Sequence, residues 1–231
     1  MDYVDVSLSD LSVMIGMPAN RDIPPHTVMS LLATFSRCQR LSIPCELGMV
    51  SSGVIVNGRD EVLDMFLKSK ANRLFWIDSD MTWTPEQFIR LLALSKLTPV
   101  VGATYPAKVD RPTFFVKFDE EVGMQPSELG LLDVQGLGLG FTVLQREVVE
   151  QVAAKAPRVL DEISGLEMAS VFRWGIFQGK RRGEDMAFFS DIRDLGYKIY
   201  MDPTIDLGHI GTKMYTGSIR DALPSTRPTI N

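Results

Sequence analysis

The sequence predicts an α/β protein with a Rossmann-like, mostly parallel central sheet flanked by helices. Within residues 12–102, apolar strand-like runs alternate with helix-periodic stretches in the order β-α-β-α-β-α-β, which is typical of parallel strands joined by right-handed crossovers. The strand-like runs are apolar throughout, as expected for strands covered on both faces. A chain of 231 residues buries roughly 70% of its unfolded surface. We therefore expect one domain over residues 1–217.

The first half supplies the regular elements. They are expected, in order, as a strand over residues 12–17, a helix whose apolar face is Val28, Leu31, Leu32 and Phe35, a strand over 44–50, a helix marked by Val62, Met65 and Phe66, a strand over 74–77, a helix carrying Phe88, Leu91 and Leu92, and a strand over 99–102. The start of the last helix is defined in detail, because Thr84 suits an N-cap, Pro85 the first helical position and Gln87 a capping box.

The second half is less regular, and we expect it to form a smaller irregular half beside the sheet. Its expected elements are strands over 113–118 and 141–145, a helix over 146–153, a helix over 183–195 stopped by Gly196, and a strand over 197–201. Residues 157–178 follow neither period. Residues 218–231 are rich in Ser, Thr and Pro, which predicts a loose tail.

Composition excludes several classes of protein. Hydrophobic residues make up 45% and charged residues 23%, which is ordinary globular composition. The balance of 24 basic and 29 acidic residues, a net charge of −5, gives no basic footprint for nucleic acid. Two cysteines, the lack of a long apolar run and a start without signal-peptide features predict a cytoplasmic protein with reduced thiols and no membrane span.

The segment Asp78-Ser79-Asp80 is the most informative pattern. Two carboxylates two residues apart follow a buried strand, and in an extended chain both side chains point the same way. The carboxyl edge of a parallel sheet is where α/β proteins bind ligands. Paired carboxylates repel each other unless a cation relieves them, and their oxygens suit Mg²⁺ or Mn²⁺. A polar loop after a strand is the simpler alternative.

Two further acids open a predicted helix at Gly183-Glu184-Asp185. The helix dipole favours carboxylates at this end, so capping explains both of them. Asp185, however, shares a face with Phe188, Ile192 and Leu195 at i, i+3, i+7 and i+10. A carboxylate on an apolar stripe indicates a pocket, where it is a candidate general base.

Isolated residues are weaker candidates. His209 lies between Gly208 and Ile210-Gly211, and the glycines leave room for a ligand, although a lone histidine is more often a packed residue. Lys213 suits a diphosphate as a point charge but is as readily explained by solvation. Arg59 opens a helix, where it is either exposed, bound to phosphate or paired with Asp78 or Asp80. The run Gly136-x-Gly138-x-Gly140 precedes a strand rather than a helix, which argues against a dinucleotide fingerprint and favours close backbone approach.

In chain order, five pieces of sequence resemble a family 2-like glycosyltransferase of the GT-A fold. They are Met17-Pro18, Arg59-Asp60, Asp78-Ser79-Asp80, Gly183-Glu184-Asp185 and Gly208-His209. The resemblance spans residue 12 to about residue 215, with Asp60 standing where that family usually has Asn. Residues 101–108, which include Tyr105, resemble the stretch bordering the sugar pocket.

This resemblance implies a metal-dependent transferase that moves a sugar from a UDP- or GDP-sugar to a glycan, lipid-linked or protein acceptor. Asp80 and His209 would hold Mn²⁺ or Mg²⁺, and Asp78 would reach the metal or the ribose. Asp185, with Glu184 beside it, would face the acceptor hydroxyl across the irregular, acceptor-side half. In an inverting reaction Asp185 would take the proton, and in a retaining one that role lapses.

The resemblance also implies a donor-side set consisting of Pro18, Arg59, Asp78, Tyr105 and Lys213. Three alternatives stay open. Asp78-Ser79-Asp80-Met81-Thr82 matches the D-x-D-x-T of haloacid-dehalogenase-like phosphatases, in which the first Asp attacks phosphorus, although that motif normally ends the first strand of its domain. A sugar nucleotidyltransferase would need a Gly-rich nucleotide loop that this chain lacks. A catalytically inactive GT-A module is the third alternative.

Overall fold

The structure is a computed structural model that describes residues 6–20, 22–111, 113–118, 123–162, 165–177 and 179–223. The elements, in chain order, are β1 (Val13–Ala19), α1 (Pro25–Arg40), β2 (Cys45–Ser51), α2 (Ile55–Lys68), β3 (Arg73–Ile77), β4 (Met81–Thr82), α3 (Pro85–Leu94), β5 (Val100–Gly102), β6 (Val116–Phe118), β7 (Leu132–Leu137), β8 (Phe141–Gln145), α4 (Arg146–Lys155), β9 (Arg158–Leu160), β10 (Glu167–Ala169), β11 (Gly175–Phe177), β12 (Lys180–Arg182), α5 (Glu184–Asp194), β13 (Ile199–Met201), β14 (Gly208–Ile210), β15 (Met214–Tyr215) and a 3₁₀ turn (Ile219–Asp221).

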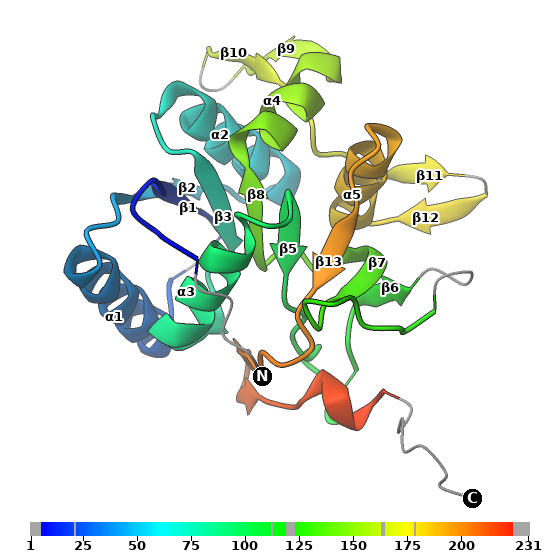
Figure 1. Ribbon diagram of the computed structural model, residues 1–231. Helices are drawn as coiled ribbons and strands as arrows, with labels where there is room; N and C mark the ends of the chain where they lie inside the picture. Colours follow the sequence, from blue (N-terminus) through cyan, green and yellow to red (C-terminus); the bar gives the residue numbers. More distant parts are fainter. Residues whose placement is uncertain are drawn as a thin grey trace, which may run out of the picture.

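A mostly parallel sheet of eight strands forms the centre of the molecule, in the order β2-β1-β3-β8-β5-β13-β7-β6 (Figure 1). β1 pairs in parallel with β2 and β3, and β5 pairs in parallel with β13. β7 and β8 run against their neighbours. The strands predicted in the first half therefore share one direction, but β8 separates β3 from β5.

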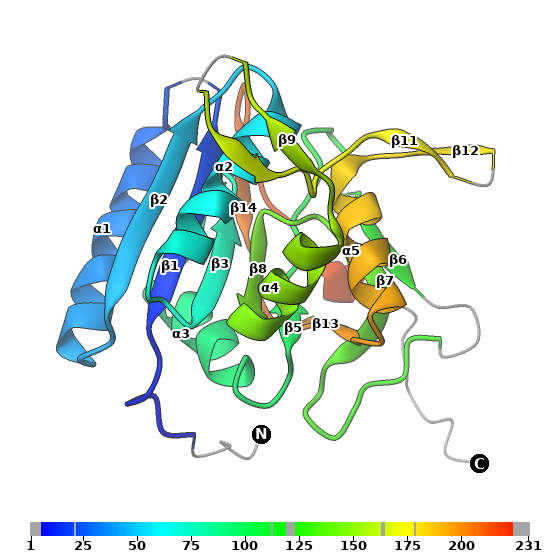
Figure 2. The same ribbon diagram turned by 90° about the horizontal axis from the view of Figure 1, so that it is seen from above.

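Helices cover both faces of the sheet, so the molecule has three layers (Figures 1 and 2). α2, α4 and α5 pack on one face, where they meet Leu74 and Trp76 of β3 in one hydrophobic core. α1 and α3 pack on the other face against Phe75 and Ile77. Successive residues of β3 thus enter opposite cores, which explains why this strand is apolar from Leu74 to Ile77.

The predicted face of α1 is only partly right, because Leu31 is buried and Phe35 packs against the core while the other two residues are exposed. Val28 is 39% exposed and Leu32 59% exposed, whereas Leu31 and four other residues of the helix are buried. The buried face carries hydroxyl groups, and two of them hydrogen-bond the carbonyl and the indole nitrogen of the buried Trp83. Ser30 Oγ donates to the Trp83 carbonyl at 2.9 Å, and Trp83 Nε1 donates to Thr34 Oγ1 at 2.8 Å. Polar side chains can be buried in a core when they are hydrogen-bonded. The spacing of apolar residues therefore does not reveal this buried helix face.

The predicted start of α3 is confirmed. Thr84 caps the helix, Gln87 returns the bond to Thr84 and Pro85 occupies the first turn. β7 was not predicted, although Leu132 and Val134 alternate with more exposed residues along it. The unassigned residues 157–178 include two short hairpin strands, β9 and β10, and the strand β11; Gln178 lies outside the described residues.

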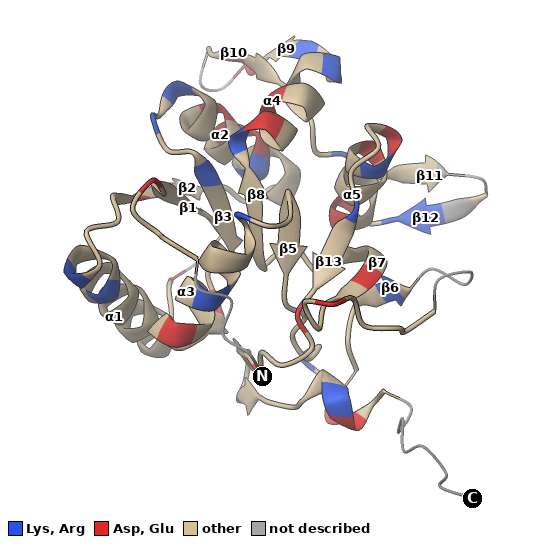
Figure 3. Cartoon of the chain, viewed as in Figure 1, with Lys and Arg blue, Asp and Glu red and all other residues tan. Residues whose placement is uncertain are grey.

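The end of the chain was expected to be loose from Ser218. Residues 218–223 instead hold the 3₁₀ turn, with Ile219 5% exposed against the core, and residues 224–231 lie outside the described part. None of the helices in the described residues combines the length and apolarity that crossing a membrane requires. Figure 3 shows basic and acidic residues mixed over the elements rather than separated into two halves.

Candidate functional site

Three predicted carboxylates meet at the carboxyl edge of the sheet around the guanidinium of Arg59. The Arg59 side chain, on α2, is only 3% exposed. Its Nη2 lies 3.3 Å from Asp78 Oδ1, while Nη1 pairs with Asp185 and lies 3.3 Å from Glu184 Oε1. We call these four residues the Arg59 cluster. Because a buried charge is stable only when it is paired, Arg59 fixes the end of β3 relative to the start of α5.

Tyr105 holds the other oxygen of Asp78. Its hydroxyl donates to Asp78 Oδ2 at 3.0 Å and accepts from the Gly140 amide at 3.3 Å. Burial raises the pKa of Tyr105 well above its ordinary value, and the charge of Asp78 adds to the shift. The phenol therefore stays protonated and acts as a fixed donor to Asp78.

The glycine run gives the turn between β7 and β8 room to pass these side chains. A Cβ at Gly138 would lie 2.7 Å from the Tyr105 hydroxyl, and a Cβ at Gly140 would overlap Asp78 Oδ2. The Leu139 amide between them donates to Asp185 Oδ2 at 3.2 Å. The close backbone approach expected from the sequence is thus an approach to the Arg59 cluster and to Tyr105.

Asp80 takes different partners from Asp78, because the chain turns after β3 with the Met81 amide bonded to the Asp78 carbonyl at 3.2 Å. Asp80 Oδ1 lies 3.3 Å from His209 Nε2, and Oδ2 pairs with Lys108 Nζ. Burial raises the pKa of Asp80, but the bonds from His209 and Lys108 outweigh it and hold the pKa below its ordinary value. The expectation that both carboxylates share one direction does not hold here.

The Asp80–His209 pair fits a divalent cation. His209 Nδ1 lies 2.9 Å from the Pro106 carbonyl oxygen, which only accepts, so Nδ1 carries a proton and Nε2 is the ring nitrogen that faces Asp80 and can ligate a metal. Asp80 Oδ1 and His209 Nε2, 3.3 Å apart, are close enough together to ligate one ion. Within the described residues no three His, Cys, Asp or Glu side chains are grouped to hold a metal by themselves. The pair therefore suits a metal whose other ligands come from substrate and water.

The net charge of the site also fits a divalent cation. Within the described part of the chain, the carboxylates of Asp78, Asp80, Glu184 and Asp185 pair with two lysine or arginine cations, Arg59 and Lys108. The four carboxylates exceed these two cations by two negative charges, on side chains that are 18–31% exposed. One divalent ion balances that excess.

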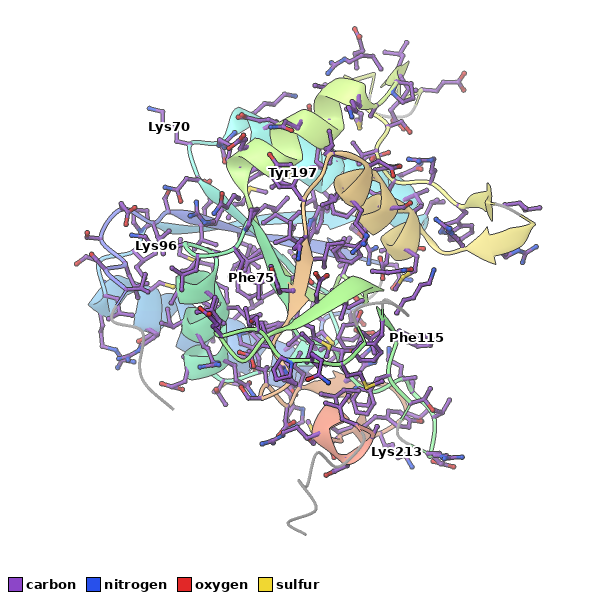
Figure 4. The ribbon with its side chains drawn as sticks, turned by 45° about the vertical axis from the view of Figure 1, so that its right-hand side comes forward. Lys70, Phe75, Lys96, Phe115, Tyr197 and Lys213 are labelled. Carbon is purple, nitrogen blue, oxygen red and sulfur yellow. The ribbon has the colours of Figure 1, made fainter. Side chains whose placement is uncertain are left out.

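Two of the predicted donor-side residues, Pro18 and Lys213, form no hydrogen bond or ion pair with these groups among the described residues. Pro18 is buried in β1, near Gly58 of α2. Lys213 is 59% exposed and bonds Asp110 at 2.6 Å, and Figure 4 shows it at the edge of the molecule, far from the buried Phe75. His26, for which we expected no special role, is exposed on α1.

Sequence reasoning missed Lys108 and Trp174. Lys108 follows Tyr105 in the stretch that the resemblance singled out, but no spacing distinguishes it from a solvated lysine. Trp174 is 65% exposed, and its Nε1 donates to Glu184 Oε2 at 2.7 Å. It leads into the β11–β12 hairpin, which projects from the body beside α5 (Figures 1 and 2). The exposure of an aromatic ring is not visible in sequence.

Open cavities of about 430 and 540 Å³ lie elsewhere. The first is next to β4 and the start of α3, and the second is near Pro99 and Tyr197. Neither is lined by Asp78, Asp80, Asp185 or His209. The candidate site is therefore defined by its convergent charges rather than by its volume.

Comparison with known proteins shows the fold. No protein-family model and no curated protein matches the sequence. Among solved structures, A197 from STIV matches with a TM-score of 0.55 and 21% identity over 87% of this chain and 86% of that one. GalNAc-T7, solved with UDP, GalNAc and Mn²⁺, matches with a TM-score of 0.56 and 10% identity over 90% of this chain and 44% of that one. The present chain thus spans less than half of GalNAc-T7. Its fold is that of a GT-A glycosyltransferase, and at these identities the likeness speaks for the fold alone.

Proposed function

We infer that the chain is a metal-dependent glycosyltransferase that transfers a sugar from a nucleotide-diphosphate sugar to an acceptor hydroxyl. The observation that carries this inference is the Asp80–His209 pair at 3.3 Å, at the carboxyl edge of a GT-A sheet. UDP- or GDP-sugars are the proposed donors, and a glycan, lipid-linked or protein hydroxyl is the proposed acceptor.

Asp80 and His209 are the residues that would hold Mn²⁺ or Mg²⁺. A divalent ion on the diphosphate neutralises the charge that develops as the bond from the sugar to phosphate breaks. Arg59 and Tyr105 bind one oxygen each of Asp78, whereas Asp80 Oδ1 faces His209. We assign Asp78 to the nucleotide, for which its partly exposed carboxylate offers the remaining lone pairs.

Asp185 is assigned to the acceptor. Arg59 and the Leu139 amide bind one oxygen each, which orients the carboxylate and leaves a lone pair on each oxygen for a hydroxyl group. In an inverting reaction this carboxylate takes the acceptor proton. Glu184, bonded to Trp174 and Arg59, supports the same end of α5.

The phosphatase alternative is not favoured by the geometry. Its nucleophile would be Asp78, which follows the third strand of the chain rather than the first. Hydrolysis of a generic aryl phosphate with Mg²⁺ would reverse this preference.

The direct test is release of nucleoside diphosphate from UDP- and GDP-sugars with Mn²⁺, comparing wild type with Asp185→Asn. We expect turnover in the variant to fall by roughly 10²-fold or more, since general-base catalysis contributes about 10²–10⁴-fold, while nucleotide affinity stays within about twofold. Asp191→Asn, on the same helix and paired with Arg173, is the matched control. Unchanged turnover in Asp185→Asn would remove Asp185 from the chemistry.

A further inference from the structure

Lys108 is a cation already bound to the carboxylate that the metal needs. Its Nζ pairs with Asp80 Oδ2, while Asp80 Oδ1 faces His209 Nε2. The two side chains of this ion pair are 37% and 31% exposed, so both remain within reach of a ligand. The Asp80 carboxylate thus binds Lys108 through one oxygen and borders the candidate metal position with the other.

Neighbouring residues position the segment that carries Lys108. The segment carrying it contacts all three residues predicted to hold the metal: Tyr105 bonds Asp78, the Pro106 carbonyl accepts from His209, and Lys108 pairs with Asp80. The stem of Lys108 lies against Gly211, where a Cβ would stand 3.1 Å from Lys108 Cδ.

The end of the same segment is also tied down. Asp110 bonds Lys213 at 2.6 Å, on the turn that follows Gly211. Contacts at Pro106 and at Asp110 thus flank Lys108 on both sides along the chain.

Its charge acts oppositely on the two ligands of the site. An ammonium group on Asp80 repels a second cation on the same carboxylate and withdraws charge from it, which weakens binding of a metal alone. A diphosphate is an anion that an ammonium group binds with charge-assisted hydrogen bonds. Once the diphosphate is present, Lys108 has a second anionic partner and Asp80 is freed for the metal.

We propose that Lys108 is a counter-cation that passes from Asp80 to the diphosphate, so that metal and nucleotide bind strongly only together. This inference rests on the proposed function, because it takes the ligand of the site to be a metal-bound nucleoside diphosphate. Coupling of this kind is reciprocal: whatever the nucleotide adds to metal affinity, the metal adds to nucleotide affinity.

The test is calorimetric titration of the full chain with Mn²⁺ alone, and with UDP or GDP in EDTA and in Mn²⁺. In Lys108→Ala we expect Mn²⁺ alone to bind roughly 5-fold tighter or better, the low end of usual coupling factors, and the nucleotide in EDTA to bind weaker by a similar factor. The gain in nucleotide affinity on adding Mn²⁺ shrinks accordingly. Lys108→Arg keeps the charge and should restore the wild-type pattern.

Lys68→Ala is the control, because Lys68 is 64% exposed and pairs with Asp64 on α2, so it removes one lysine charge outside the site. An unchanged Mn²⁺ affinity in a folded Lys108→Ala protein would overturn the proposal. Tighter Mn²⁺ with unchanged nucleotide affinity would overturn the passage to the diphosphate. If wild type with Mn²⁺ binds neither nucleotide, the proposed function fails. The titration with Mn²⁺ alone then still tests whether the ion pair between Lys108 and Asp80 weakens metal binding.

Discussion

Asp60 neighbours Arg59 in α2 but binds the backbone of a distant segment. Its Oδ1 accepts from the Val171 amide at 2.8 Å and from the Phe172 amide at 3.0 Å, just before the chain reaches Trp174. Burial raises the pKa of Asp60 to about 6, and the amide bonds only partly oppose this shift. The residue that departs from the pattern of the family the sequence resembles thus anchors the segment leading to Trp174.

The raised pKa of Asp60 sets a pH dependence of stability. The ordinary pKa is 3.8 and the folded value about 6, so the folded state binds the proton more tightly and stability falls as pH rises between about 4 and 6. Asp60→Asn keeps an oxygen for both amides without a charge. We expect it to match wild type at pH 4 and to be more stable at pH 7 by up to about 3 kcal/mol, measured by urea unfolding at each pH.

Asp64→Asn, one turn further along α2 and paired with Lys68 at the surface, is the control and should leave the pH profile unchanged. An Asp60→Asn protein that is less stable than wild type at every pH would contradict this account, because the charge of Asp60 would then be needed for its amide bonds.

Single residues at the ends of elements were predictable. Asp78 and Asp80 follow an apolar strand and Asp185 opens a helix, and these local patterns fix their place at the sheet edge. Lys108 was not predictable because it reaches Asp80 through a loop path that no periodicity describes. The contact of Lys213 with Asp110 likewise depends on where two loops lie.

At the scale of elements, the turn between β7 and β8 joins the two halves of the site. Its glycines border Tyr105 and Asp78, and its Leu139 amide binds Asp185. The glycine run was visible in sequence, but β7 was not, since its short alternating pattern was outweighed by the glycines that end it. The glycines at the end of β7 let the backbone pack closely against Asp78 and Tyr105, which explains their presence in a strand.

Gly140→Ala tests the role of that turn. The new Cβ would overlap Asp78 Oδ2 and lie 2.8 Å from the Tyr105 hydroxyl, so Asp78 must move. We expect UDP or GDP affinity in Mn²⁺ to fall by roughly 10-fold or more, which corresponds to about 1.4 kcal/mol. Gly53→Ala, where a Cβ meets no atom within 4 Å, should bind as wild type does. Wild-type affinity in a folded Gly140→Ala protein would separate the turn from the nucleotide site.

At the scale of the whole molecule, the sheet brings residues from five separate segments to one edge. Alternating elements predicted the parallel strands and the two-sided cover of helices, because both follow from local periodicity and apolar runs. The antiparallel insertion of β8 between β3 and β5 was not predictable, since strand pairing over such distances depends on the whole chain. That insertion places the glycine turn against Asp78, and so completes the site.

The central claim is that Asp80 and His209 bind a metal together with a nucleoside diphosphate. It is tested most directly by thermal unfolding with UDP, GDP and CDP, each with and without Mn²⁺. Ligand at about 100 times its dissociation constant adds roughly 2.7 kcal/mol, or about 5–10 °C for a domain of this size. We expect a shift that needs both Mn²⁺ and one nucleotide, is lost in Asp80→Ala and survives in Asp10→Ala, whose aspartate lies on the surface beside Lys96. A cooperative unfolding transition that none of these ligands moves would contradict the claim.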